Sequence, residues 1–90
     1  MILETYLNHP TFGILFRICL ADGDQELFAS LYAQRLFFLV ENSDAGDLIF
    51  EPLGRNEARV LLENKLRRLR QVGRFAEYNR LQKIYQKIFQ

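Results

Sequence analysis

The sequence predicts an α+β protein, in which a small, strongly bent antiparallel sheet or barrel precedes a C-terminal hairpin of two helices. The spacing of apolar residues changes from two to about 3.6 near residue 55. Turn-forming clusters interrupt residues 1–54 at short intervals. The charge also reverses, because residues 1–54 carry a net charge of −6 and residues 55–90 one of +7. We therefore expect a β domain over 1–54 and a helical hairpin over 55–90.

The first predicted strand covers residues 12–20, where side chains alternate between two faces. One face holds Phe12, Ile14, Phe16, Ile18 and Leu20, and the other holds Gly13, Leu15, Arg17 and Cys19. A period of two is typical of a strand. The Asp22-Gly23 pair that follows is a strong hairpin signal, so the chain is expected to turn back there into the next strand.

Three further strands are predicted, over residues 27–33, 35–40 and 48–50. The segment 27–40 also contains residues that suit a helix. Its length, its Phe content and the turns on either side favour strands. Pro52 and Gly54 are expected to end the last strand. Short strands at close spacing are typical of a compact barrel, which leaves few edges exposed.

Both faces of the predicted third strand are apolar. Leu36, Phe38 and Val40 point one way, and Phe37 and Leu39 point the other. One face must fill the barrel. The other face either packs against the helices or forms an exposed aromatic patch for a partner.

Tyr32 and Gln34 are the best candidates for such an exposed patch. Tyr is amphipathic and common at binding hot spots, and Gln34 interrupts the apolar run with a donor and an acceptor. The alternation over 27–33 places Tyr32 on one face with Phe28 and Ser30, opposite a more apolar face that looks like core. We therefore expect Tyr32 to point outward.

Two helices are predicted over about residues 56–72 and 75–89, where the apolar period becomes helical. Asn56 is expected to cap the first helix, and Gly73 suits the left-handed position that ends it. The expected apolar stripes are Ala58, Leu61, Leu62, Leu66 and Leu69 in the first helix and Tyr78, Leu81, Ile84, Tyr85 and Ile88 in the second. The short link between them predicts an antiparallel pair.

The composition points to a soluble, cytoplasmic protein. Apolar residues make up 49% of the 90 residues, which is ample for a globular fold. Cys19 is the single cysteine and fits a reducing compartment. No apolar run approaches the ~20 residues that span a bilayer, and the first residues lack the features of a signal peptide.

The sequence offers no recognisable catalytic or metal-binding set. His9 and Cys19 are the only histidine and cysteine, and two such residues do not make a zinc site. A glycine-rich phosphate loop is absent, and neither Ser30 nor Ser43 has a recognisable activating partner. We therefore expect no enzymatic activity, no cofactor and no direct small-molecule ligand.

Three segments of the chain resemble the PipX family of cyanobacterial proteins: YLNHPTFG at 6–13, LYAQRLFFLV at 31–40 and FEP at 50–52. Shorter matches continue in register to Glu77-Tyr78, so the resemblance covers nearly the whole chain. The turn at 42–47 matches least. Phe16 stands where the family has Tyr, so a hydroxyl contact at that position does not carry over.

The resemblance implies a Tudor-like β domain, followed by two helices, in a regulatory adaptor of nitrogen and carbon signalling. Such proteins bind the signalling protein PII when 2-oxoglutarate is low. When it is high, they bind the transcription factor NtcA as a coactivator. The two partners use overlapping surface, and 2-oxoglutarate binds the partners rather than the adaptor.

The resemblance also implies which residues contact the partners. Carried over by position, the partner-binding residues are Glu4, Tyr6, Tyr32, Gln34, Arg35, Leu36 and Phe38. The free chain is expected to be a monomer, and the basic helices leave room for a further regulator that contacts the PII complex.

The alternative function is that of a small barrel that binds nucleic acid. Arg67, Arg68, Arg70 and Arg74 supply positive charge for it. However, these cations lie in the predicted helices, whereas most aromatic residues lie in the strands. The groove that combines aromatic and basic residues is therefore not evident, and we expect no strong binding to DNA.

Overall fold

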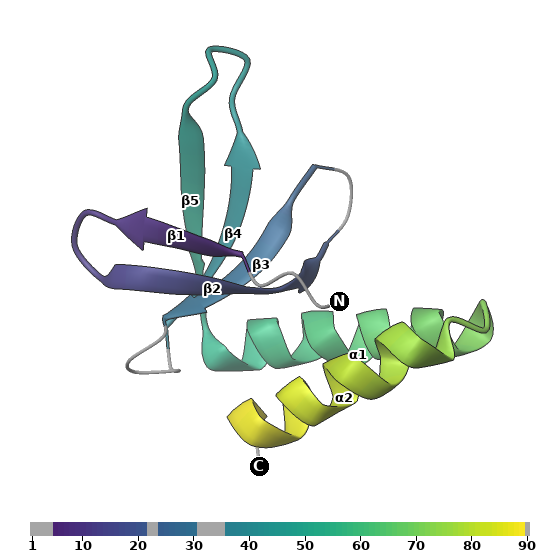
Figure 1. Cartoon of the computed structure of the whole chain (residues 1–90). Helices are drawn as coiled ribbons and strands as arrows, with labels where there is room; N and C mark the ends of the chain where they lie inside the picture. Colours follow the sequence, from purple (N-terminus) through teal and green to yellow (C-terminus); the bar gives the residue numbers. More distant parts are fainter. Residues whose placement is uncertain (1–4, 22–23, 31–35, 90) are drawn as a thin grey trace.

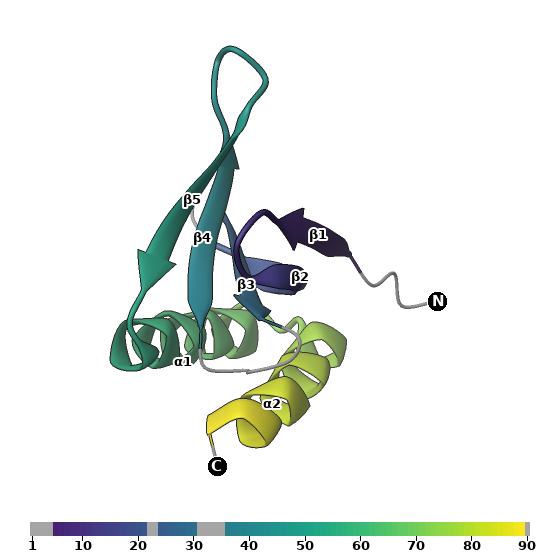
Figure 2. The ribbon, with the colours of Figure 1, turned by 90° about the vertical axis from the view of Figure 1, so that its left-hand side faces the viewer.

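The computed structural model describes residues 5–21, 24–30 and 36–89, and within them a curled sheet precedes two helices (Figure 1). The elements are β1 (Tyr6–His9), β2 (Gly13–Leu20), β3 (Glu26–Ser30), β4 (Phe37–Asn42), β5 (Leu48–Leu53), α1 (Arg55–Gln71) and α2 (Phe75–Phe89). The five strands follow chain order in one antiparallel sheet, which curls into a half-barrel (Figure 2). The predicted α+β fold class is thereby confirmed.

The sequence pattern missed β1, the short first strand. It covers four residues and pairs with β2 through partners that run from Tyr6 opposite Phe16 to His9 opposite Gly13. Four residues are too few to show a period. The last strand is longer than predicted, because it continues through Pro52 to Leu53. Proline is tolerated there since β5 is an edge strand of the sheet.

A bulge in β2 interrupts the predicted alternation over 12–20. The pairing with β3 shifts register between Arg17 and Cys19, so that Ile18 is the additional residue. Ile18 is buried against the helices, and Cys19 packs against the same cluster. Bulges bend a strand and increase its twist, which favours the curl of this sheet.

The inner face of the curled sheet forms its own apolar core. Its buried members are Leu15, Phe28, Phe38 and Val40, with Leu7 and Phe50 packed against them. Phe28 and Ser30, which the alternation placed on the face of Tyr32, are both buried, and Tyr32 itself lies outside the described residues. The curl of the sheet encloses this inner face, so β3 packs against a hydrophobic core on both of its faces.

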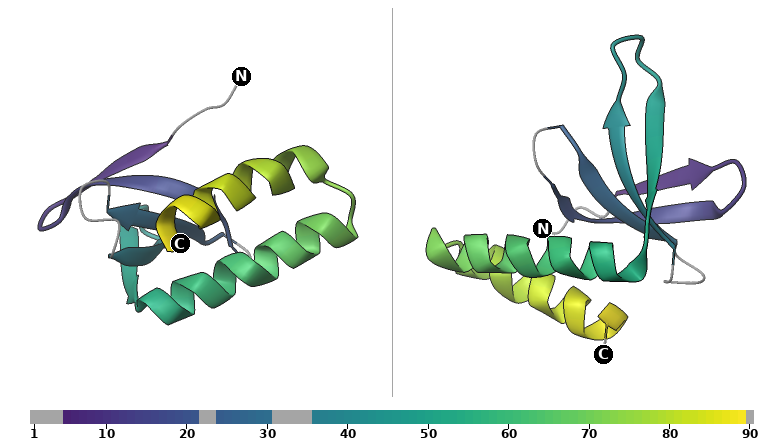
Figure 3. Two further views of the ribbon diagram at one scale, coloured as in Figure 1. Left: turned by 90° about the horizontal axis from the view of Figure 1, so that it is seen from below. Right: turned by 180° about the vertical axis from the view of Figure 1, so that it is seen from behind.

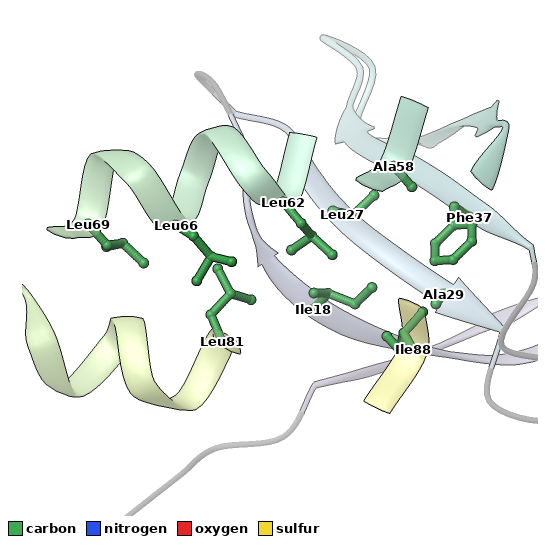
Figure 4. Packing of buried hydrophobic residues seen from close by; sticks show 10 residues of the cluster. All are labelled: Ile18, Leu27, Ala29, Phe37, Ala58, Leu62, Leu66, Leu69, Leu81 and Ile88. Carbon is green, nitrogen blue, oxygen red and sulfur yellow. The ribbon is translucent and has the colours of Figure 1, made fainter. Parts of the chain in front are cut away.

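The outer face of the sheet packs on the helices, which lie side by side beneath it (Figure 3). Ile18, Leu27, Ala29 and Phe37 meet Ala58, Leu62, Leu66, Leu69, Leu81 and Ile88 in one buried cluster (Figure 4). Of the two alternatives for the second apolar face, the structure therefore shows that the helical hairpin covers it.

The helix ends differ from the prediction by one residue at each end of α1. Gly54, rather than Asn56, precedes the first turn, and its N–H donates to Oε1 of Glu57 at 3.2 Å. Gly73 follows the helix with a φ of +79°, as a left-handed terminating residue. The N–H of Arg74 then donates to the carbonyl of Leu69 at 2.9 Å, which closes the turn into α2.

The C-terminal end of α2 is tied to both α1 and the sheet. The guanidinium of Arg55 donates to the carbonyl of Ile88 at 3.1 Å and lies 4.9 Å from the ring centre of Phe89. The ring of Phe89 stacks on Phe37 of β4 at 5.5 Å. These contacts fix the hairpin against the sheet.

Candidate protein-interaction surface

Three of the seven predicted contact residues lie in the described part of the chain. They are Tyr6, Leu36 and Phe38. The other four, Glu4, Tyr32, Gln34 and Arg35, fall outside the described residues. Tyr32, Gln34 and Arg35 belong to the segment between Ser30 and Leu36. These two flanking residues are joined by a hydrogen bond, since the N–H of Ser30 donates to the carbonyl of Leu36 at 2.9 Å.

The sheet register brings Tyr6 and Leu36 to the same end of the β domain. Tyr6 pairs with Phe16, which pairs with Ala29, which pairs with Phe37, so these residues form one row across four strands. Leu36 directly precedes Phe37. Neighbouring strands lie about 4.8 Å apart, so β1 and β4 are separated by about 14 Å along the sheet. That span is within the reach of one protein interface.

Tyr6 lies on the outer face of the sheet, beyond the cover of the helices. Directly paired residues share a face, and its partner Phe16 packs against the outer cluster. Because Tyr6 is in the edge strand β1, 48% of it stays exposed. Phe12 and Leu36 are also exposed, at 41% and 37%. We call Tyr6 and Leu36 the apolar end surface. Phe12 is separate from it, because it follows the other end of β1 and its ring packs against Phe38 of the inner core.

Phe38 is not part of this surface. It is only 4% exposed and belongs to the inner core of the half-barrel. Its ring lies 5.6 Å from that of Phe12 and 6.3 Å from that of Phe50. Phe38 therefore supports the exposed ring of Phe12 from below and has little area of its own to offer a partner.

The β1–β2 turn that carries Phe12 is organised by His9, a role that the sequence analysis missed. Nδ1 of His9 accepts hydrogen bonds from the N–H groups of Thr11 and Phe12, at 3.0 and 3.2 Å. Its ring lies 4.9 Å from the ring of Phe12 and 4.9 Å from that of Phe50. The sequence did indicate a turn at this point. A polar side chain that can accept hydrogen bonds from the N–H groups two and three residues later, with Pro and Gly close by, is typical of turns.

The described residues hold no group of three or more His, Cys, Asp or Glu side chains placed to bind a metal ion. Burial raises the pKa of the Cys19 thiol to about 11, although the charges of Lys65, Arg80 and Arg17 act in the opposite direction. Cys19 is therefore a neutral thiol near pH 7, and not an activated nucleophile. Within the described ranges, no helix has the length and apolar content needed to cross a membrane.

A family model described as PipX, PII-interacting protein X, matches residues 3–89. The match includes the whole sheet and both helices. No curated protein matches the chain significantly.

Proposed function

This chain belongs to the PipX family of PII-interacting proteins, and from that membership we propose that it is a regulatory adaptor that exchanges between two partners. PII holds the chain when 2-oxoglutarate is low. NtcA takes it up when 2-oxoglutarate is high and is thereby activated for transcription. The chain itself has no catalytic role, acts in the cytoplasm and binds neither 2-oxoglutarate nor a cofactor.

The apolar end surface is the observation that supports this proposal. Tyr6 and Leu36 expose apolar area at one end of the sheet, and among the described residues no metal-binding group accompanies them. Exposed aromatic groups on a rigid sheet are typical of protein interfaces. The predicted contacts Tyr32, Gln34 and Arg35 lie between Ser30 and Leu36, beside this surface in the chain. Overlapping use of the surface makes binding of the two partners exclusive.

The positions of the charges disfavour the alternative, direct binding to nucleic acid. The exposed aromatic residues Tyr6 and Phe12 belong to the half with a net charge of −6, which repels phosphates. Arg67, Arg68 and Arg70 are exposed on α1, at a distance in sequence from those rings. A stacking platform combined with a basic groove is the usual arrangement for single strands.

A pull-down from cyanobacterial lysate tests the proposal. The tagged chain is incubated with and without added 2-oxoglutarate, and the retained proteins are identified by mass spectrometry. We expect PII to be retained without 2-oxoglutarate and NtcA with it. Retention of the same proteins under both conditions would contradict control of the exchange by 2-oxoglutarate. Failure to retain PII under either condition would contradict the proposal that the chain binds PII.

A further inference from the structure

A cleft of about 500 Å³ lies on the helix side of the sheet, at the end of the β2–β3 hairpin. The sheet contributes Cys19, Leu20, Ala21 and Leu27, and α1 contributes Leu61, Asn64, Lys65 and Arg68. The hairpin residues lie where β2 ends and β3 begins, whereas Leu36 follows the other end of β3. The cleft is therefore distinct from the apolar end surface.

One flank of α1 supplies the charged side of the cleft. Leu61, Lys65 and Arg68 follow a spacing of four and three residues, so they lie in a row along the helix. This row runs beside the buried stripe that contains Leu62 and Leu66. The ion pairs among the described residues are Arg17 with Glu26 and Arg74 with Glu77, so neither Lys65 nor Arg68 is neutralised by one.

The floor of the cleft is apolar and uncharged. Leu27 is fully buried beneath it, and Leu61 is half-buried at its side. Cys19 is held as a neutral thiol, although Lys65, Arg80 and Arg17 all favour its ionised form. Three cations therefore lie near this floor, and they come from α1, α2 and β2.

A smaller hollow of about 110 Å³ extends the cationic region beyond Lys65. Arg17 and Arg80 line it together with Glu77, the one carboxylate in its wall. Glu77 is paired with Arg74 at 3.3 Å, and Arg17 is paired with Glu26 at 3.0 Å. Lys65, Arg68 and Arg80 take part in neither of these ion pairs, so they can bind an anionic ligand.

An apolar floor beside unneutralised cations fits a ligand that is both acidic and apolar. A nucleic acid fits less well, because none of the eight lining residues is aromatic and a base has nothing to stack on. We propose that this cleft binds an acidic segment of a partner protein, in which Asp or Glu residues flank an apolar side chain. Lys65 and Arg68 hold the carboxylates, and Leu20 and Leu61 receive the apolar group.

The test uses the full chain, labelled with ¹⁵N, and an acetylated hexapeptide of alternating Leu and Glu. We expect saturable shifts of the amide signals of Leu20, Ala21, Leu27 and Asn64 on titration. The double variant Lys65→Glu with Arg68→Glu should weaken binding by about tenfold or more, because both attractions become repulsions. The pair Lys65→Gln with Arg68→Gln should weaken it less, in the same direction.

The matched control is Arg67→Glu with Arg70→Glu, which reverses two exposed charges of α1 outside the cleft. It should retain most of the affinity, and melting curves should show all variants folded.

Equal losses in the control, the absence of saturable shifts, or equal binding of a hexapeptide of Leu and Lys would each overturn the proposal. Tighter binding of oligothymidine at the same signals would assign the cleft to nucleic acid instead. Binding of PII by the Lys65→Glu, Arg68→Glu variant should be unchanged, which separates this site from the proposed function.

Discussion

The ring of His9 stacks on the ring of Phe38, with centroids 5.3 Å apart and planes inclined by 26°. This contact joins the end of β1 to the start of β4 across the inside of the half-barrel. Because His9 also fixes the turn that carries Phe12, the position of this exposed ring depends on a buried aromatic ring.

Phe38→Ala should unfold the β domain more readily rather than remove a direct contact. The ring is buried among His9, Phe12 and Phe50, so its removal leaves a cavity. A buried Phe→Ala change costs about 3–5 kcal/mol of the free energy of unfolding, a large part of a small domain's stability. Urea denaturation measures this loss, and Phe38→Leu should show a smaller one. Unchanged stability with lost partner binding would restore Phe38 as a contact residue.

Two substitutions at His9 separate its hydrogen bonds from its ring. His9→Asn keeps an acceptor near the position of Nδ1 but loses the ring, whereas His9→Phe keeps a ring and loses the acceptor. In His9→Phe, the amide hydrogens of Thr11 and Phe12 should exchange with solvent faster than in His9→Asn. Hydrogen exchange followed by NMR measures both sites. Equal exchange in the two variants would mean that the imidazole nitrogen does not hold the turn.

The buried thiol predicts a loss of stability at alkaline pH. Burial raises the pKa of Cys19 from 9.0 to about 11, so the folded state disfavours the thiolate. This contribution to stability is complete below pH 9 and is lost as pH rises from 9 to 11, since the unfolded state releases the proton first. The free energy of unfolding should therefore fall more steeply over that range in the natural chain than in Cys19→Ala. If the free energy of unfolding fell equally steeply with pH in the two proteins, burial would not raise the pKa of the Cys19 thiol.

Much of the fold could be predicted from the sequence because its patterns are long and regular. The two helical stripes, the turn at Gly73 and the two apolar faces of β4 each follow from spacing alone. The bulge at Ile18 and the short strand β1 could not, because a register shift and a four-residue strand depend on contacts with β3 and β2. The burial of Phe38 was missed for a related reason. Alternation gives two faces but does not say which one the curled sheet encloses.

Tyr6→Ala should weaken binding to both PII and NtcA while leaving the fold intact. Tyr6 is half-exposed in an edge strand, so truncation removes contact area without opening the core. An interface Tyr near the centre of a contact costs about 2 kcal/mol, or about thirtyfold in affinity. Phe75→Ala is the matched control, because Phe75 is an exposed aromatic residue at the start of α2, 59% exposed against 48% for Tyr6. Isothermal titration calorimetry gives the affinities. Equal losses in both variants would argue against a site at the apolar end surface.

The central claim is that one surface is exchanged between two partners under the control of 2-oxoglutarate. The most direct measurement mixes the full chain with equimolar PII and NtcA and follows the complexes by size-exclusion chromatography with mass detection, while 2-oxoglutarate is raised. The account predicts that the complex with PII gives way to the complex with NtcA, and that no species contains both. A stable assembly of all three proteins, or a distribution that does not change with 2-oxoglutarate, would contradict it.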